Sequence, residues 1–262
     1  MIDRHTFQGA YTWSAVMLLT ASTLLVPPTF SSTAQAQSSD AAITELRPFE
    51  AVYKTTALGM TLDLTRSLTR DGTNYRLKSS GKNFLINMDE TGDFRLTDSG
   101  IEGVRFHSKV KTLKTKKRVV EFDTARGVIK SLKNGVWTEH PWTAGVLDQF
   151  SQQQQLRLIL MQSAPPPEIL QFQVIDGAKI SDKSWRRLPN ETLQTPIGSI
   201  EAIHYQAIHT NPKKRASEIW LAPSLDYLMV KTRHVERSAT IKVEIKSLNW
   251  LDEVSPTEHK TG

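Results

Sequence analysis

The sequence predicts a mainly β protein: a large curved antiparallel sheet, or incomplete β-barrel, with one long helix packed on its concave face. Residues 49–139 and 170–248 alternate between apolar and polar side chains with a period of two, the pattern of half-buried strands. Asp-Gly and Asn-Gly pairs interrupt this alternation and are typical of tight hairpins. A single segment after the N-terminal leader, Thr143–Met161, has the spacing of a long helix.

The first 36 residues have the organisation of a secretory signal peptide. Arg4 lies in a short polar segment, the apolar run Trp13–Val26 follows, and Ala34 and Ala36 supply small residues for cleavage. The run is short for a permanent transmembrane helix, so cleavage is expected rather than a retained anchor. The sequence has no cysteine, which excludes disulfides and a lipid-modified cysteine. These features predict a periplasmic protein with no integral membrane anchor after processing.

Cleavage after Ala36 would leave a chain of suitable length for one large β domain. The polar composition at both ends suggests loose tails. The expected organisation is a signal peptide over residues 1–36, an N-terminal tail over 37–48, a single β-rich domain over 49–251 and a C-terminal tail over 252–262.

The alternation assigns particular side chains to the core face of the sheet. The pairs Asp71-Gly72 and Asn134-Gly135 mark two of the hairpin turns. About a dozen strands joined by short turns predict a mainly antiparallel sheet, and a sheet of that width curls or splits. Apolar residues expected on the core face include Leu62, Leu64, Leu68, Val104, Phe106 and Val110.

The predicted helix Thr143–Met161 is apolar nearly all round in its C-terminal half, which favours burial. Thr143, Asp148 or Ser151 could cap its first turn by accepting backbone N–H bonds. Pro165 and the prolines after it prevent continuation. A lone apolar helix needs a large apolar surface, and a curled sheet supplies one on its concave face.

Three short motifs occur in a characteristic order. They are Tyr75-Arg76-Leu77, then Leu147–Ser151 with Leu156-Arg157, then Ile219–Pro223 leading to Tyr227–Val230. In this order the chain resembles the bacterial envelope family known as domain of unknown function 3108. Met229 stands where proline is often found in that family, which puts the local geometry in doubt. The resemblance implies a periplasmic β-rich domain without an assigned activity. The architecture is also similar to that of lipoprotein carriers, in which an incomplete barrel folds over helices.

Residues for catalytic or metal chemistry form no recognisable motif. The histidines lack the usual ligand spacings and there are no thiolates, so neither a metal nor a cofactor is expected. Asp148 and Ser151 are three residues apart on the helix, but the flanking sequence lacks the glycines of a nucleophile elbow. A non-enzymatic protein is therefore favoured. A hydrolase stays open as a third hypothesis, which clustering of Asp148, Ser151 and a histidine in one cleft would support.

The chain carries a formal net charge of +6. One interpretation of its basic runs is a solvated face that keeps strand edges from pairing with other chains. The other is attraction of an anionic envelope polymer or protein complex. The runs lack the interleaved aromatics of single-strand binders, so nucleic acid is not an expected partner. The expected basic patch comprises Lys109, Lys111, Lys114, Lys116, Lys117 and Arg118, with a second cluster at Lys213–Arg215.

Aromatic and apolar residues before and on the helix form the candidate ligand site. The tryptophans could seal the mouth of the barrel by packing, or serve as a ligand platform. The leading hypothesis is a non-enzymatic envelope protein that binds or carries an apolar or amphipathic molecule, such as a lipid, in a half-barrel. It predicts an apolar cavity between helix and sheet. The alternative is a structural or adaptor protein that binds an anionic envelope component through the basic patch. The candidate ligand residues are Trp137, Trp142, Phe150, Leu156 and Ile159.

Overall fold

The computed structural model describes residues 45–57, 59–209, 215–236 and 239–251. The predicted signal peptide, most of the N-terminal tail, the C-terminal tail from residue 252 and the lysines of the second basic cluster lie outside these ranges. The strands before the helix are β1 (Phe49–Ala57), β2 (Met60–Asp71), β3 (Asn74–Lys82), β4 (Asn87–Thr97), β5 (Gly100–Lys111), β6 (Thr115–Asp123), β7 (Val128–Lys133), β8 (Val136–Pro141) and β9 (Val146–Leu147). The elements that follow are α1 (Gln149–Gln162), β10 (Ile169–Asp176), β11 (Lys179–Thr195), β12 (Gly198–Ala207), β13 (Arg215–Ala222), the 3-10 turn η1 (Pro223–Leu225), β14 (Leu228–Glu236) and β15 (Ala239–Trp250).

All the described strands belong to one sheet of 15 strands. Each strand pairs with its neighbours in sequence except β8 and β9, which do not pair with each other, and β1 also pairs with β15 in a ladder from Phe49↔Trp250 to Ala57↔Ile241. That ladder joins the first and last strands, so the two free edges of the sheet are β8 and β9. The pairing is antiparallel except between β9 and β10. The predicted large, open, mainly antiparallel sheet is confirmed.

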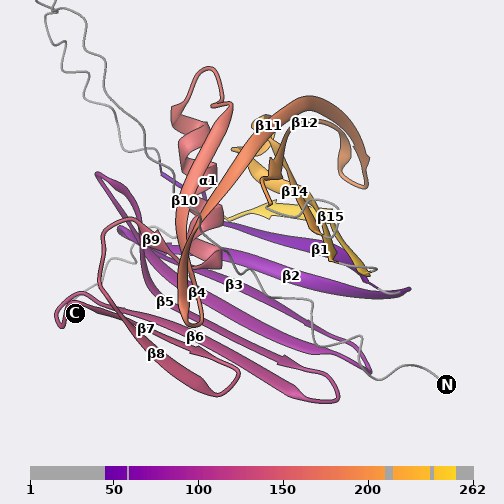
Figure 1. Cartoon of the computed structure of the whole chain (residues 1–262). Helices are drawn as coiled ribbons and strands as arrows, with labels where there is room; N and C mark the ends of the chain where they lie inside the picture. Colours follow the sequence, from indigo (N-terminus) through magenta and orange to yellow (C-terminus); the bar gives the residue numbers. More distant parts are fainter. Residues whose placement is uncertain (1–44, 58, 210–214, 237–238, 252–262) are drawn as a thin grey trace, which may run out of the picture.

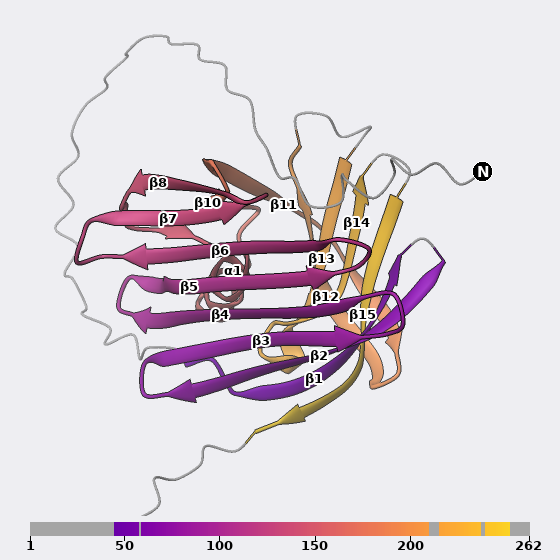
Figure 2. The same cartoon turned by 90° about the horizontal axis from the view of Figure 1, so that it is seen from below.

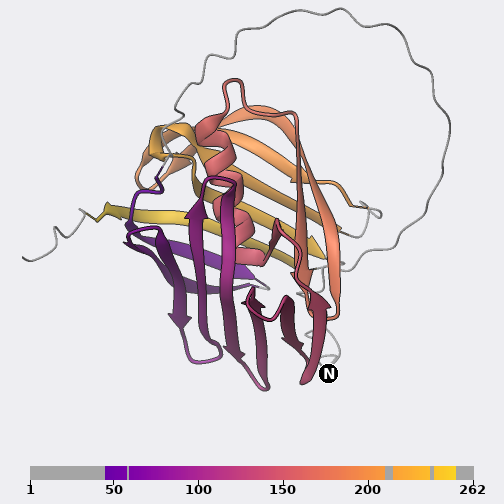
Figure 3. The same ribbon diagram turned by 90° about the vertical axis from the view of Figure 1, so that its left-hand side faces the viewer.

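The sheet curls so that its two halves enclose α1 (Figure 1). The view in Figure 3 shows the helix running between the strands of the first half and those of the second. Figure 2 looks onto the outer side of the first half, with α1 behind β4 and β5. The predicted helix on the concave face is confirmed, and because strands cover it from two sides it is buried at most of its positions.

The hairpin turns follow the glycine signals of the sequence. Asn134 and Gly135 both have positive φ, 54° and 80°, between β7 and β8. Gly72, with φ 57°, turns β2 into β3. A two-residue turn of this kind matches the right-handed twist of the strands that it joins, and residues other than Gly and Asn are strained there.

The predicted start of the helix was wrong. Val146 and Leu147 are extended and pair in parallel with Gln173 and Val174 of β10, and α1 begins only at Gln149. Asp148 is the cap: its carboxylate accepts from the N–H groups of Phe150 and Ser151 at 2.7 and 3.1 Å. The capping carboxylate fixes where helical geometry begins, because it binds donors that no helical carbonyl can reach.

One core assignment was also wrong. Val104 is exposed, whereas Gly103 and Phe106 face the core. The cause is a β-bulge, since Asp93 pairs with Arg105 and the next residue of β4 pairs with Gly103, which leaves Val104 as the extra residue. A bulge inserts one unpaired residue and changes the alternation, so a strict period of two fails there.

The helix lies very close to the sheet at its first turn. A Cβ added to Gly92 of β4 would stand 2.8 Å from Cβ of Phe150, so this position accepts only glycine without displacement of the helix. Farther along, Gln155 accepts a bond from the N–H of Ile101 at 2.6 Å. In the part of the chain that the structure describes, no helix is long and apolar enough to span a bilayer.

Candidate functional site

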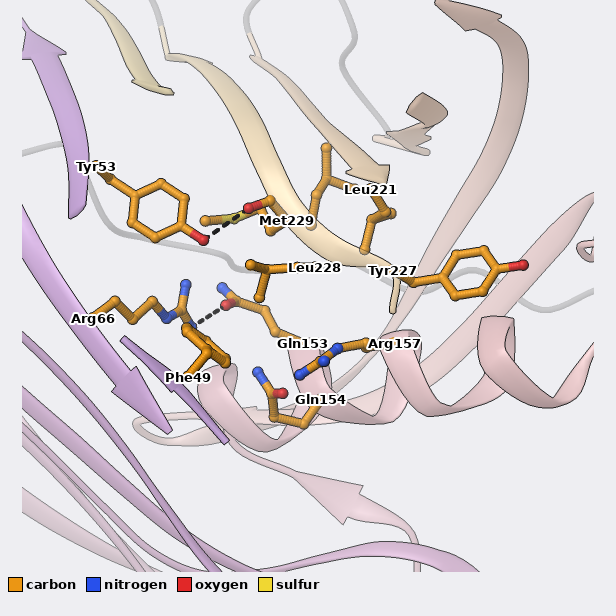
Figure 4. Close-up of a pocket in the computed structure, with 11 residues that line it drawn as sticks. Phe49, Tyr53, Arg66, Gln153, Gln154, Arg157, Leu221, Tyr227, Leu228 and Met229 are labelled. Carbon is orange, nitrogen blue, oxygen red and sulfur yellow. Dashed lines mark hydrogen bonds between the residues drawn. The ribbon is translucent and has the colours of Figure 1, made fainter. Parts of the chain in front are cut away.

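A small hollow, lined by apolar side chains and by two arginines and two glutamines, lies between α1 and the sheet where β1, β2, β13 and β14 face the helix (Figure 4). The volume open to water is about 20 Å³, which is room for one or two water molecules or a group of that size. The leading hypothesis predicts an apolar cavity between helix and sheet, and this hollow is too small to hold an apolar ligand. The lining residues are Phe49, Tyr53, Arg66, Gln153, Gln154, Arg157, Ile219, Leu221, Tyr227, Leu228 and Met229.

Arg66 enters the hollow from β2. Its neighbours on the same face of the strand, Leu64 and Leu68, are core residues, and Arg66 is only 8% exposed. One terminal nitrogen, Nη2, donates to Gln153 at 2.5 Å, and the guanidinium lies 5.1 Å from the ring centre of Phe150. Nε is buried without a hydrogen-bond partner, and burial lowers the pKa of Arg66. An inward position on a strand has thus placed a cation in the core.

Arg157 enters from the opposite side, on the buried face of α1. It is 2% exposed, and its guanidinium lies 5.7 Å from the ring centre of Phe49. Nε donates to the backbone carbonyl of Asp226 at 2.6 Å. Both terminal nitrogens, Nη1 and Nη2, are buried and without a partner among the described residues. Burial lowers the pKa of Arg157 to about 10, so the side chain is still a cation at neutral pH.

None of the residues that line the hollow is a carboxylate. Within the described residues, no carboxylate lies within ion-pair distance of Arg66 or Arg157. Tyr53 donates its hydroxyl to the carbonyl of Met229 at 2.8 Å, and burial raises its pKa to about 12, so it is neutral. Gln154 has a buried amide oxygen without a partner. The carboxylates of Asp226 and Glu90 attract Arg157 and Arg66, respectively, over longer distances, and burial raises the pKa of Glu90.

This arrangement is suited to holding an oxyanion rather than to catalysis. Two guanidiniums and an amide offer planar donors of the kind that match a carboxylate or phosphate edge. An unpaired buried cation is unfavourable unless a counter-charge or water satisfies it. The hollow offers no nucleophile and no group with a pKa near neutrality that could transfer a proton. The donors in the hollow are of the kind that bind negatively charged groups.

Sequence reasoning missed both arginines although each had a signal. Arg66 falls at the inward position between Leu64 and Leu68 in a strand of period two. Arg157 is the one charged residue in a helix segment that is otherwise apolar and polar-neutral. A charge at a position that the pattern assigns to the core is a stronger indication of a site than aromatic content.

The structure does not bring the five predicted ligand residues together. Trp137 and Trp142 are 52% and 36% exposed on and just after edge strand β8. Phe150 and Leu156 are core residues, and Ile159 is half-buried. None of the five lines the hollow, although the ring of Phe150 contacts the guanidinium of Arg66. Their role in ligand binding stays a prediction.

The predicted basic patch divides into two parts. Lys109, Lys111, Lys114, Lys116 and Lys117 are exposed around the turn between β5 and β6. Arg118 is half-buried instead, with Nη1 3.9 Å from Asp176 of β10. Lys133 of β7 also reaches Asp176, at 2.5 Å. These two cations link opposite halves of the curled sheet, so they stabilise its closure rather than extend the patch.

Asp148 and Ser151 are helix caps. Ser151 Oγ lies 2.7 Å from Oδ2 of Asp148 and accepts from the N–H of Asp148 at 2.8 Å, which completes a capping box. Both residues are 1% exposed, and burial raises the pKa of the Asp148 carboxyl. No histidine takes part in this network among the described residues. The clustering that the hydrolase hypothesis required is not found.

A second serine has histidine neighbours. Ser217 Oγ lies 2.7 Å from Nδ1 of His234 and 3.3 Å from Nε2 of His209, and His234 Nε2 is 3.8 Å from Glu236. Ser217 is only 4% exposed, and a nucleophile needs an open approach and oxyanion donors. Burial and the charges of Arg215 and His234 lower the pKa of His209 to about 4. We interpret this cluster as a polar network that joins β13 to β14.

Comparison with known proteins supports the fold. One similar structure is a β-barrel-like protein of domain of unknown function 1849 from Brucella abortus. The match covers 80% of this chain and 100% of the Brucella chain, with 10% identity and a TM-score of 0.50. More distant matches are a provisionally described lipoprotein from Parabacteroides distasonis (10% identity, 78% and 96% coverage, TM-score 0.29) and a provisionally described exported protein with a YmcC-like fold from Bacteroides fragilis (9% identity, 78% and 96% coverage, TM-score 0.29). None of the curated proteins matches the sequence.

The sequence profile of one family covers most of the sheet. The match runs over residues 48–246, from the residue before β1 into β15, and so includes α1 and every lining residue of the hollow. The chain therefore belongs to the family described as "Protein of unknown function (DUF3108)".

Proposed function

We propose that the protein is a non-enzymatic binding protein of the bacterial envelope, and that it holds the anionic group of an amphipathic molecule between Arg66 and Arg157. The signal-peptide pattern of residues 1–36 supports export to the periplasm. The observation that carries the proposal is Arg157, whose two terminal nitrogens are buried and face the hollow without a partner.

The cost of burial is the physical reason. Removing a guanidinium from water is unfavourable by several kcal/mol unless its donors are satisfied, and two such groups share this hollow. Stacking on Phe49 and Phe150 offsets only part of that cost, since a cation–π contact contributes about 0.5–2 kcal/mol. A bound oxyanion would satisfy both arginines and remove the repulsion between them.

The size of the hollow restricts what can enter. About 20 Å³ admits the oxygens of a carboxylate or the tip of a phosphate, but no acyl chain. The apolar part of the ligand would therefore remain outside the hollow, beside the half-buried side chains of Tyr227 and Met229 at its margin. This differs from a lipid carrier with a preformed apolar cavity, because recognition depends on the charged end.

The test is binding of dodecanoic acid compared with dodecan-1-ol, which has the same chain without the charge. We expect the acid to bind in calorimetry and to raise the melting temperature, and the alcohol to do neither. Arg157→Met and Arg66→Met should each weaken binding of the acid about tenfold to a hundredfold, the loss of one charge-assisted hydrogen bond. Arg126→Met, in the exposed turn after β6, is the matched control.

Acetate and inorganic phosphate distinguish a free anion from an amphiphile. Binding of acetate as tight as that of dodecanoate would show that the chain contributes nothing and that the ligand is a small ion. Equal binding of acid and alcohol, or full binding by Arg157→Met, would refute recognition of the anionic group at the hollow.

A second candidate function is attachment to an anionic envelope component through the exposed lysines of β5 and β6. Lys109 and Lys117 are direct cross-strand partners. Like charges placed directly opposite each other destabilise a sheet, and Asp89, the partner of Lys109 on its other side, offsets only part of this repulsion. An anionic partner would remove that repulsion. Glutamate substitution of Lys116 and Lys117 should abolish retention of such a partner while the fold survives, as measured by pull-down and circular dichroism.

A further inference from the structure

The exposed lysines of β5 and β6 share one end of the sheet with three exposed apolar side chains. The turns from β3 to β4 and from β5 to β6 project at the same end, because Lys82 pairs with Asn87 and Asn87 pairs with Lys111 (Figure 2). Phe84 and Leu85 occupy the first turn and are 91% and 46% exposed. Leu113 occupies the second and is 102% exposed. We call this region the lysine end: residues 82–89 and 109–117.

Hydrogen bonds hold both turns. The backbone therefore keeps the apolar side chains at the tips of the turns exposed to solvent. Asn83 Oδ1 accepts from the N–H groups of Leu85 and Ile86 at 2.9 and 2.8 Å, and Asn83 Nδ2 donates to the carbonyl of Thr61 at 3.2 Å. These bonds form an Asx turn that directs Phe84 away from the protein. In the second turn, the N–H of Thr112 donates to the carbonyl of Lys114 at 3.1 Å.

The charge around the tips is almost entirely positive. The lysine end contains six lysines and one acidic residue, Asp89. Cross-strand partners lie on the same face of a sheet, so Lys82 and Lys111 share one row of the outer face, and Lys109, Lys117 and Asp89 share the next. Exposed large apolar residues surrounded by one sign of charge mark an interaction surface rather than an ordinary solvated face.

We propose that the lysine end docks onto a bilayer that contains anionic lipid, with Phe84, Leu85 and Leu113 entering the interface and the lysines contacting lipid phosphates. An anionic bilayer supplies both complements at once, an apolar layer and a plane of negative charge above it. The lysine stems can lie along apolar surface while their ammonium groups stay at the phosphates. A soluble polyanion would complement the lysines alone and would leave the three apolar tips in water.

This inference gives the second candidate function a specific partner and rests on it, but it is independent of the arginine hollow. The hollow is lined from α1, β1, β2, β13 and β14, and none of its lining residues belongs to the lysine end. Loss of ligand binding at Arg157 would therefore leave membrane docking unchanged.

Vesicle flotation of the full mature chain tests the inference. Vesicles of phosphatidylcholine with phosphatidylglycerol should carry the protein, and vesicles of phosphatidylcholine alone should carry much less. The double variant Lys111→Ala, Lys114→Ala should bind the anionic vesicles at least tenfold more weakly. Its control is Arg95→Ala, Arg126→Ala, which removes the same charge from exposed side chains near the opposite end and should bind normally.

The apolar tips need a separate comparison. Leu113→Ser and Phe84→Ser should also weaken vesicle binding at least tenfold, whereas Ile169→Ser, which changes a 48% exposed residue at the start of β10, should not. Circular dichroism and melting temperature confirm that each variant is folded.

Dextran sulfate separates the inference from the function on which it rests. Binding to dextran sulfate without binding to anionic vesicles would overturn membrane docking but keep an anionic polymer as partner. Vesicle binding that survives Leu113→Ser and Phe84→Ser would overturn insertion of the tips. Binding that survives the lysine variant would overturn the role of the lysine end altogether.

Discussion

Under the proposed function, Arg66 serves recognition at the expense of stability. It occupies a core position of β2, where the loss of water around its charge is unfavourable. It forms a single hydrogen bond, to a half-buried glutamine. Replacing a buried charge by an apolar side chain of similar volume is often neutral or stabilising. The same reasoning distinguishes a binding residue from a structural one.

The free energy of unfolding of Arg66→Met is therefore expected to equal or exceed that of the natural protein. Urea denaturation without ligand measures this. Gln153 can turn toward solvent when its partner is lost, because it is half-buried. A loss of more than about 1 kcal/mol would indicate that Arg66 is structural, since that is the usual worth of a hydrogen bond. Arg157→Met is less informative here because it also leaves the carbonyl of Asp226 without its donor.

His209 is expected to make the free energy of unfolding depend on pH. Its pKa in the folded protein is lowered to about 4, below the ordinary value of 6.5, chiefly by burial. The unfolded chain therefore binds a proton first as the pH falls. Stability that His209 contributes is present above about pH 6.5 and is lost as the pH falls toward about 4.

The check is urea unfolding at pH 7.5 and pH 5 for His209→Gln and for His107→Gln, a histidine on β5 outside this cluster. We expect His209→Gln to lose less stability than the natural protein between the two pH values. The His107 variant should follow the natural protein. An unchanged pH dependence in His209→Gln would show that this side chain is not the responsible group.

At the scale of the element, α1 is set in place by its first turn. Asp148 forms a reciprocal capping box with Ser151, Phe150 packs against Gly92, and Leu147 is already part of the sheet. The helix therefore begins where a short parallel strand ends, and the cap converts one geometry into the other. This placement puts Arg157, two turns farther along α1, beside the hollow.

Asp148→Ala should lower the free energy of unfolding by about 1–2 kcal/mol, because the N–H groups of Phe150 and Ser151 lose their acceptor. Asp148→Asn keeps an acceptor oxygen in the same place and should lose clearly less. Thermal and urea denaturation of the two variants give the comparison. Equal losses would mean that the charge, and not the hydrogen-bond acceptor, is the stabilising feature.

At the scale of the whole molecule, the ladder between β1 and β15 unites the fold. Without it the chain would form two separate meanders, one on each side of the helix. The ion pairs from Arg118 and Lys133 to Asp176 draw the far parts of these meanders together around α1. A core shared by both halves predicts that residues 49–251 unfold as one domain.

That prediction can be tested by following urea unfolding with two probes. Far-UV circular dichroism reports the whole sheet, whereas tryptophan fluorescence is weighted toward the buried side chains of Trp185 and Trp220 in the second half. Coincident transitions are expected of a single cooperative unit. Two separated transitions would divide the chain into independent halves.

Local patterns in the sequence determined the fold class. Period-two alternation and the glycine turns specified antiparallel strands, because the side chains of a strand point alternately to opposite faces. The apolar segment before Pro165 specified the helix, and the exposure of Lys109, Lys111 and Lys117 followed from their outward positions in β5 and β6. The family motifs fall within the region that the family profile covers.

Other features depend on contacts between segments distant in sequence, so they became evident only from the folded chain. The bulge that exposes Val104 arises from pairing with β4, and the start of α1 depends on the pairing of Leu147 with β10. The hollow exists because Arg66 and Arg157, far apart in the chain, face each other across the core (Figure 4). The sequence could mark each arginine as a charge at a core position. Whether the two met, and whether any carboxylate neutralised them, depended on how the sheet curled around the helix.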